Sequence, residues 1–208
     1  MPKKTFFNIN EEKRKMIEEK AINEFAVYSY ENSSINRIVE NCKISKGSFY
    51  QYFENKEDLF RYIISLSVEK KMKYVNATLI SEIDNGFIKI IKEIFKSGLK
   101  FAYENEKLAS IGVLLMKNNN SEIYHKIIGQ NKNMAIDFYK KLIEIEIEKG
   151  EIKPDINVEF VSYLINSMII NLSEYFFEIN KNNEKKYSEE MLFLVDDLMD
   201  MLINGIGL

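Results

Sequence analysis

The residues of this chain with the clearest chemical potential gather in one stretch, KISKGSFYQYFENKEDLF, at residues 43–60. It combines lysines, two serines and five aromatic residues with Gly47, the only glycine among the first 85 residues. Ammonium, hydroxyl and amide groups donate hydrogen bonds to phosphate oxygens and base edges, and a glycine lets a backbone approach another surface closely. These residue types are the ones that can reach phosphate oxygens or base edges, so the stretch is a candidate binding site.

Residues that other kinds of site require are scarce. His125 is the only histidine and Cys42 the only cysteine, so no metal cluster, histidine-dependent triad or internal disulfide is visible. We expect a structural or surface role for His125 and a buried position for Cys42. No nucleophile paired with a base and no glycine-rich phosphate loop is visible either. The sequence therefore predicts no enzyme, with no catalytic residue, no metal and no cofactor.

Charge and hydropathy limit the kinds of partner that this chain can have. The N-terminus MPKKTFFNIN lacks the apolar run of a signal peptide, and no segment reaches about 18 uninterrupted apolar residues. A cytoplasmic protein without a membrane partner is expected. The net charge is −3, yet residues 1–73 hold 14 Lys and Arg against 11 Asp and Glu. A polyanion would therefore bind near the N-terminal end.

Helices must position these residues. Two prolines and eight glycines in 208 residues are few, and apolar residues recur at helical spacing, so the chain is predicted to be all-α. The first four helices are expected to begin after caps at Asn10, at Ser33 or Ser34, at Ser45 and at Asn55, and later helices are expected at 85–103, 106–117, 121–149, 156–180 and 187–204. The alternation IEIEIE at 143–148 favours a strand on its own, but no partner strand is visible and a helix is expected.

Two short helices joined by a tight turn form a helix-turn-helix unit over residues 34–53. One of them carries an apolar face, and the next begins at Ser45 with the polar residues described above. Two-helix turns are common in all-α proteins, so the alternative is an all-α protein-interaction or dimerisation module in which this unit only packs. A helical enzyme ranks last because no catalytic constellation is visible.

The segment INRIVENCKISKGSFYQYFENKEDLF resembles the N-terminal signature of the TetR family of bacterial transcriptional regulators. That signature has an Ile-Ala helix, an Ala-Gly-Val-Ser turn, then Lys-Gly-Thr, a hydrophobic residue, Tyr-x-Tyr-Phe and Lys-Glu-x-Leu. This chain departs from it at Val39, Cys42 and Lys43. Lys43 stands where the turn commonly has glycine, and a non-glycine residue in a left-handed conformation costs about 1 kcal/mol.

The resemblance implies an N-terminal three-helix DNA-binding domain at residues 1–55, a connecting fourth helix at about 56–78, and a larger C-terminal helical domain at 79–208 for effector binding and dimerisation. The recognition helix would hold Phe49, Tyr52 and Phe53 in its core, and Lys3 and Lys4 would reach the duplex from a flexible arm. The implied DNA-binding residues are Ser34, Asn36, Ser45, Lys46, Gly47, Ser48, Tyr50, Gln51 and Lys56.

In the C-terminal region the resemblance implies an effector pocket and a four-helix dimer interface. Expected pocket residues are Phe87, Phe95, Phe101, Met116, Tyr124, Phe138 and Met168. Expected interface residues are Phe160, Leu164, Met168, Leu172, Tyr175, Phe176, Leu192, Val195, Leu198, Met199 and Leu202. The last long helices are apolar on more than one face, which itself indicates cover on two sides. The alternative for both sets is ordinary core of a monomer.

Taken together, these features predict a homodimeric, ligand-responsive transcriptional regulator, most simply a repressor. Its partners would be a near-palindromic double-stranded DNA operator and a small hydrophobic or aromatic effector that releases it.

Overall fold

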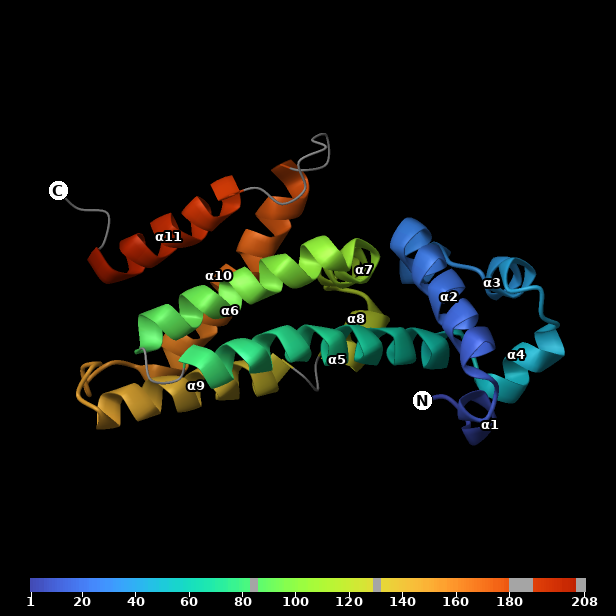
Figure 1. Cartoon of the computed structure of the whole chain (residues 1–208), viewed down its shortest axis with the longest axis horizontal. Coiled ribbons are helices and arrows are strands. Elements are labelled where there is room, and N and C mark those ends of the chain that lie inside the picture. The colour runs from blue at the N-terminus through green and yellow to red at the C-terminus, as the bar shows by residue number, and fades with distance from the viewer. Residues whose placement is uncertain (83–85, 129–131, 180–188, 205–208) are drawn as a thin grey trace. The chain divides into compact units, whose positions relative to one another are not determined.

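The computed structural model describes residues 1–82, 86–128, 132–179 and 189–204, and every regular element in these ranges is an α-helix (Figure 1). The all-α prediction is confirmed. No helix in these ranges is long and apolar enough to cross a membrane. The helices are α1 (Lys4–Phe7), α2 (Glu11–Asn32), α3 (Ile35–Asn41), α4 (Lys46–Tyr52), α5 (Lys56–Glu82), α6 (Phe87–Glu104), α7 (Glu106–Lys117), α8 (Glu122–Ile128), α9 (Lys132–Glu148), α10 (Val158–Ile179) and α11 (Glu189–Asn204).

The chain forms two compact units. The N-terminal unit comprises Met1–Lys70 and Asn105–Ile127, and the C-terminal unit comprises Lys71–Glu104 and Ile128–Leu208. Helix α5 contributes to both, and α7 joins the N-terminal unit although it follows α6 in the chain. The division into domains at residues 55 and 78 stays a prediction.

The N-terminal unit is built on α2. Asn10 caps this helix as predicted, because its Oδ1 accepts a hydrogen bond from the Lys13 amide at 2.8 Å. Phe25 on the inner face of α2 is fully buried and meets the ring of Phe60 on α5 at 4.8 Å. Near its C-terminal end α2 is kinked at Ser29, whose φ of 56° and ψ of 177° are rare outside glycine.

Helix α1 is an element that the sequence did not predict. Phe6 is fully buried and anchors it, with its ring 4.7 Å from that of Phe53 and 5.3 Å from that of Tyr62. The expected flexible arm is therefore wrong for residues 3–7, which pack against the helix-turn-helix unit.

In the C-terminal unit α9 packs along α10, and α6 packs along α11 and α9. The segment IEIEIE lies in α9, so its helical prediction is confirmed. Ile143 is fully buried, and Glu146 is 2% exposed, accepting from the first amide of α6 at Phe87 (3.1 Å) and pairing with Lys149 (2.7 Å). Gly150 ends the helix with a φ of 79°, as expected of a C′ glycine. The single helix predicted over 121–149 appears as α8 and α9, and residues 129–131 lie outside the described ranges.

Candidate nucleic-acid interface

The turn between α3 and α4 has the left-handed geometry expected at Lys43. Its φ is 53°, and its amide donates to the Glu40 carbonyl at 3.0 Å while the Ile44 amide donates to the Val39 carbonyl at 3.0 Å. This 6→1 and 4→1 pattern ends α3 sharply and turns the chain into α4. The exposed Lys43 side chain stands beside the first turn of α4.

Replacing Lys43 by glycine should raise the free energy of unfolding by about 1 kcal/mol, because glycine adopts a positive φ without the steric cost of a Cβ. Urea unfolding followed by circular dichroism measures the change. Lys46→Gly is the matched control, since this exposed lysine is the first residue of α4 and has no positive φ to relieve, so glycine there should leave stability unchanged or lower it by less than about 1 kcal/mol. Loss of stability in Lys43→Gly would show that the side chain makes a contact that outweighs the strain.

Helix α4 is held by its cap and by its aromatic side. Ser45 Oγ accepts from the Ser48 amide at 3.0 Å, which confirms the predicted N-cap. Phe49 is 1% exposed and Tyr52 6% exposed, and Phe53 directly after the helix is fully buried. These three residues form the core side of the helix, as predicted.

The opposite side of α4 is exposed and polar. Lys46, Gly47 and Gln51 are exposed, and Tyr50 keeps 49% of its surface. In the described part of the chain, no side-chain hydrogen bond is made by the Lys46 ammonium, the Tyr50 hydroxyl or the Gln51 amide. A Cβ at Gly47 would meet only Ser45 Oγ, at an ordinary 3.6 Å. The fold therefore does not need glycine at this position. The exposed side of α4 presents these unpaired side-chain donors around the uncovered backbone of Gly47.

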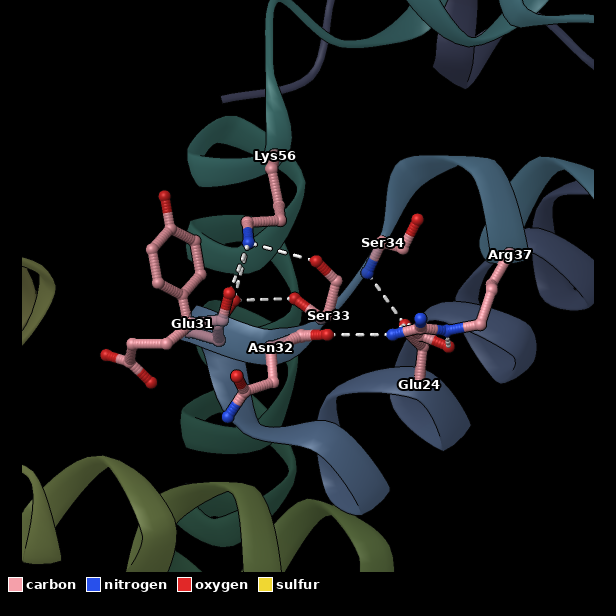
Figure 2. Close-up of polar contacts among 8 residues, drawn as sticks. Glu24, Glu31, Asn32, Ser33, Ser34, Arg37 and Lys56 are labelled. Carbon is pink, nitrogen blue, oxygen red and sulfur yellow. Dashed lines mark hydrogen bonds and ion pairs between the residues drawn. The ribbon is translucent and has the colours of Figure 1, made fainter.

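The first turn of α3 lies beside a buried carboxylate, shown in Figure 2. Glu24 on α2 is 4% exposed and accepts from the Ser34 amide at 2.7 Å. Arg37 on α3 donates to the same carboxylate through Nη2 at 2.6 Å and Nε at 2.9 Å, and Nη2 also reaches the Asn32 carbonyl at 2.7 Å. This charge-assisted network fixes the start of α3 on α2.

Two predicted DNA contacts, Ser34 and Asn36, sit in this turn. Ser34 is the N-cap residue of α3, but its hydroxyl makes no capping hydrogen bond. Asn36 is exposed. The Glu24 network thus holds the backbone while both polar side chains remain open to a partner.

Lys56, at the start of α5, has other partners than the predicted phosphate. Its ammonium group donates to the carbonyls of Tyr30 (2.6 Å), Ser33 (3.0 Å) and Glu31 (3.2 Å), and Figure 2 shows Lys56 beside Glu31 and Ser33. It also lies 4.6 Å from the centre of the Tyr30 ring. An ammonium group has three N–H donors, and all three are engaged at the end of α2, so a phosphate contact would require one to be given up. Burial lowers the pKa of Lys56, and the carboxylates of Glu31 and Glu24 oppose that shift.

Comparison with known proteins agrees with this geometry. Residues 17–63 match the family described as "Bacterial regulatory proteins, tetR family". A crystal structure of a TetR family transcriptional regulator from Chloroflexus aurantiacus J-10-FL matches with a TM-score of 0.76 at 28% identity, over 99% of this chain and 98% of that one. The helix-turn-helix region of the chain therefore matches the TetR family. Its relatives are regulators of transcription, in agreement with the expectation that it is not an enzyme.

Other relatives match over different lengths. The B. subtilis HTH-type regulator YuxN is 42% identical over 59 residues, which span 28% of this chain and only 20% of that protein. The B. subtilis fatty acid metabolism regulator protein is 26% identical over 89% of this chain and 91% of its own length. FadR from B. subtilis in complex with stearoyl-CoA has a TM-score of 0.73 over 93% of this chain and 99% of that one, at 20% identity, which concerns the fold.

Cys42 lies on the inner face of the TetR-family helix-turn-helix and is 1% exposed, as predicted. Burial raises the pKa of its thiol to about 11. At neutral pH the group is therefore a protonated, inaccessible thiol, the opposite of the exposed thiolate that redox sensors use.

The residues expected to line the TetR-family effector pocket fall in both units. Met116 and Tyr124 lie on α7 and α8 in the N-terminal unit, and the other five lie in the C-terminal unit. Phe95 and Phe101 are buried. The remaining three, Phe87, Phe138 and Met168, are partly buried. Two hollows within the N-terminal unit, one of about 200 Å³ beside Tyr30, Glu57 and Lys126, include none of the seven. The pocket stays a prediction.

The expected dimer-interface residues also divide by burial. Val195 and Met199 on α11 are buried in the core of their own unit, whereas Phe160 is 56% and Tyr175 51% exposed on α10. Partly buried members are Leu164, Met168, Leu172 and Leu198, and the side chains of Phe176, Leu192 and Leu202 lie outside the described part of the structure. The packing of Val195 and Met199 is thus accounted for within one chain, and the interface stays a prediction.

Proposed function

We propose that this chain is a TetR-family, ligand-responsive repressor that binds a near-palindromic operator as a homodimer and leaves it when a small molecule binds. The observation that supports DNA binding is that α4 has one buried aromatic side and one exposed polar side. Its aromatic side is buried by the unit, and its other side presents Lys46, Tyr50 and Gln51 with unsatisfied polar groups around an open Gly47. Such a helix suits the major groove, where lysine, tyrosine and glutamine reach phosphates and base edges.

In this proposal residues 1–55 form the DNA-binding domain, α5 connects it up to about residue 78, and residues 79–208 hold the effector and the dimer interface. Two recognition helices in successive half-sites require a separation of about 34 Å or somewhat more. The exposed Phe160, Tyr163 and Tyr175 on α10 support a partner surface there, because aromatic side chains are enriched in protein–protein interfaces.

Helices α7 and α8 supply the link between effector and DNA in this proposal. They belong to the same compact unit as the helix-turn-helix. The Lys107 ammonium on α7 donates to Asn23 Oδ1 on α2 at 2.6 Å. The side-chain amide of Asn118, just after α7, donates to the Glu31 carboxylate at 2.7 Å. A ligand that favours another position of α7 would therefore favour another position of α2, and the spacing of the recognition helices would no longer fit the operator.

The effector class in this proposal is small and hydrophobic or aromatic, because phenylalanine and methionine walls adapt to such molecules. The relative named as a fatty acid metabolism regulator makes fatty acyl chains the first class to test.

Selection of bound fragments from a random DNA pool tests the proposal. We expect a near-palindromic sequence whose binding weakens steeply with salt and is relieved by an effector. A selected sequence without two-fold symmetry would contradict the dimer, and a pool with no enrichment at low salt would contradict DNA binding altogether.

A further inference from the structure

The C-terminal end of the recognition helix is closed by a segment from the other end of the domain. An α-helix leaves its last four carbonyls without an intrahelical donor. In α4 these belong to residues 49–52, and the first of them accepts from the Phe53 amide at 2.9 Å. The other three need donors from elsewhere.

Residues 3–5 provide all three donors. The Lys3 ammonium donates to the Tyr50 carbonyl at 3.0 Å, and the Lys3 amide donates to the Tyr52 carbonyl at 2.8 Å. The Thr5 hydroxyl donates to the Gln51 carbonyl. Every C-terminal carbonyl of α4 is therefore satisfied, and a lysine charge lies at the negative end of the helix dipole.

The segment that makes these contacts is itself fixed. Phe6 is fully buried among the rings of Tyr52, Phe53 and Tyr62, with centroid distances of 5.9, 4.7 and 5.3 Å. All three donors thus lie within three residues of a fully buried side chain. Short helices are unstable in isolation, so a seven-residue helix depends on what closes its ends.

We propose that Lys3, Thr5 and Phe6 form a clamp that sets the position of the recognition helix and so the fit of Tyr50 and Gln51 to base edges. Lys3 and Thr5 are positioning residues that act through the backbone of α4. This inference rests on the proposed DNA-binding function, but its structural half, the closing of α4, can be measured without DNA.

Matched pairs of variants separate the clamp from a charged arm. Thr5→Val removes the hydroxyl and keeps the shape, whereas Thr5→Ser keeps the hydroxyl. Lys3→Met removes the ammonium from the Tyr50 carbonyl, whereas Lys4→Met removes the same charge from the next residue, whose ammonium makes no hydrogen bond or ion pair within the described ranges. Thr5 and both lysines are exposed, so all four variants should fold.

Two readouts are needed: affinity for the selected operator over a range of salt, and hydrogen exchange of the Phe49 and Phe53 amides. We expect Thr5→Val and Lys3→Met each to weaken operator binding about fivefold and to speed exchange by a similar factor. Thr5→Ser and Lys4→Met should exchange like the unchanged protein, and Thr5→Ser should also bind like it. In Thr5→Val the slope of affinity against salt should stay unchanged, since no charge is removed.

Unchanged exchange in both Thr5→Val and Lys3→Met would overturn the clamp. A second pattern would also overturn it. If Lys3→Met and Lys4→Met reduced the slope of log affinity against log salt equally, and Thr5→Val left operator affinity unchanged, residues 3 and 4 would be contacting phosphates as a charged arm. If the unchanged protein bound no DNA, the proposed function would fail, and the exchange data would still decide whether residues 3–5 close α4.

Discussion

Replacing Tyr50 by alanine is expected to weaken binding to the selected operator about 10- to 100-fold while leaving the free energy of unfolding nearly unchanged. The ring is 49% exposed, and its hydroxyl makes no hydrogen bond in the described part of the chain, so the fold loses little when it is removed. A contact with a base edge or a phosphate would be lost entirely. Fluorescence anisotropy with labelled operator measures the affinity, and urea unfolding measures the stability. Tyr50→Phe then shows how much of the loss belongs to the hydroxyl.

Tyr52→Ala is the matched control, because the same residue type lies two positions further along α4 on its buried side. Tyr52 is 6% exposed and contacts the ring of Phe6. Its removal should lower the free energy of unfolding by about 3 kcal/mol through the cavity it leaves. Operator binding should then fall with the folded fraction and, because the Phe6 clamp loses one of its rings, by no more than about a further fivefold. If Tyr50→Ala bound the operator as tightly as the unchanged protein, the exposed side of α4 would not contact DNA there, and the helix-turn-helix would be a packing unit.

The recognition helix could be predicted from sequence because its determinants are local. Helical spacing puts Phe49 and Phe53 on one side of the helix, the TetR-family resemblance implies Tyr52 on that side and Tyr50 on the other, and Ser45 marks the start of the helix. A tight turn could be predicted because three residues between two helical patterns leave room for little else, and the TetR-family resemblance, in which glycine is common at this position, implied a left-handed conformation for Lys43. Each of these inferences depends on neighbours within about one or two turns of the chain.

The contacts that close the C-terminal ends of α2 and α4 could not be predicted, because the lysines that make them are distant in sequence. The carbonyl that accepts from the Lys56 ammonium at 2.6 Å lies 26 residues earlier, and the one that accepts from the Lys3 ammonium lies 47 residues later. A lysine beside a DNA-binding helix favours a phosphate contact on type alone. Only the fold shows that each of these two lysines lies within hydrogen-bonding distance of the carbonyls at a helix end. The one available signal for α1 was the aromatic pair Phe6 and Phe7 just before the Asn10 cap, which is more apolar than a free arm requires.

Lys56→Met should therefore act on stability and not on phosphate binding. The substitution keeps much of the side chain's length but leaves the carbonyls of Tyr30, Glu31 and Ser33 without the ammonium group. Partly buried acceptors that lose a charged donor cost about 1–3 kcal/mol in total, so we expect the free energy of unfolding to fall by about 2 kcal/mol. The end of α2 also loses a cation at its negative pole. Urea unfolding of the full chain measures the change.

The contrasting variant is Lys46→Met, which removes an exposed lysine from the first turn of α4. Its ammonium group has no partner in the described part of the chain, so stability should change by less than about 0.5 kcal/mol. The slope of log affinity against log salt should fall by about 1 if Lys46 neutralises one phosphate, and it should stay unchanged in Lys56→Met at temperatures where that variant is folded. A reduced slope in Lys56→Met with full stability would instead mean that Lys56 leaves the end of α2 when DNA binds, and that the carbonyls it releases find other donors.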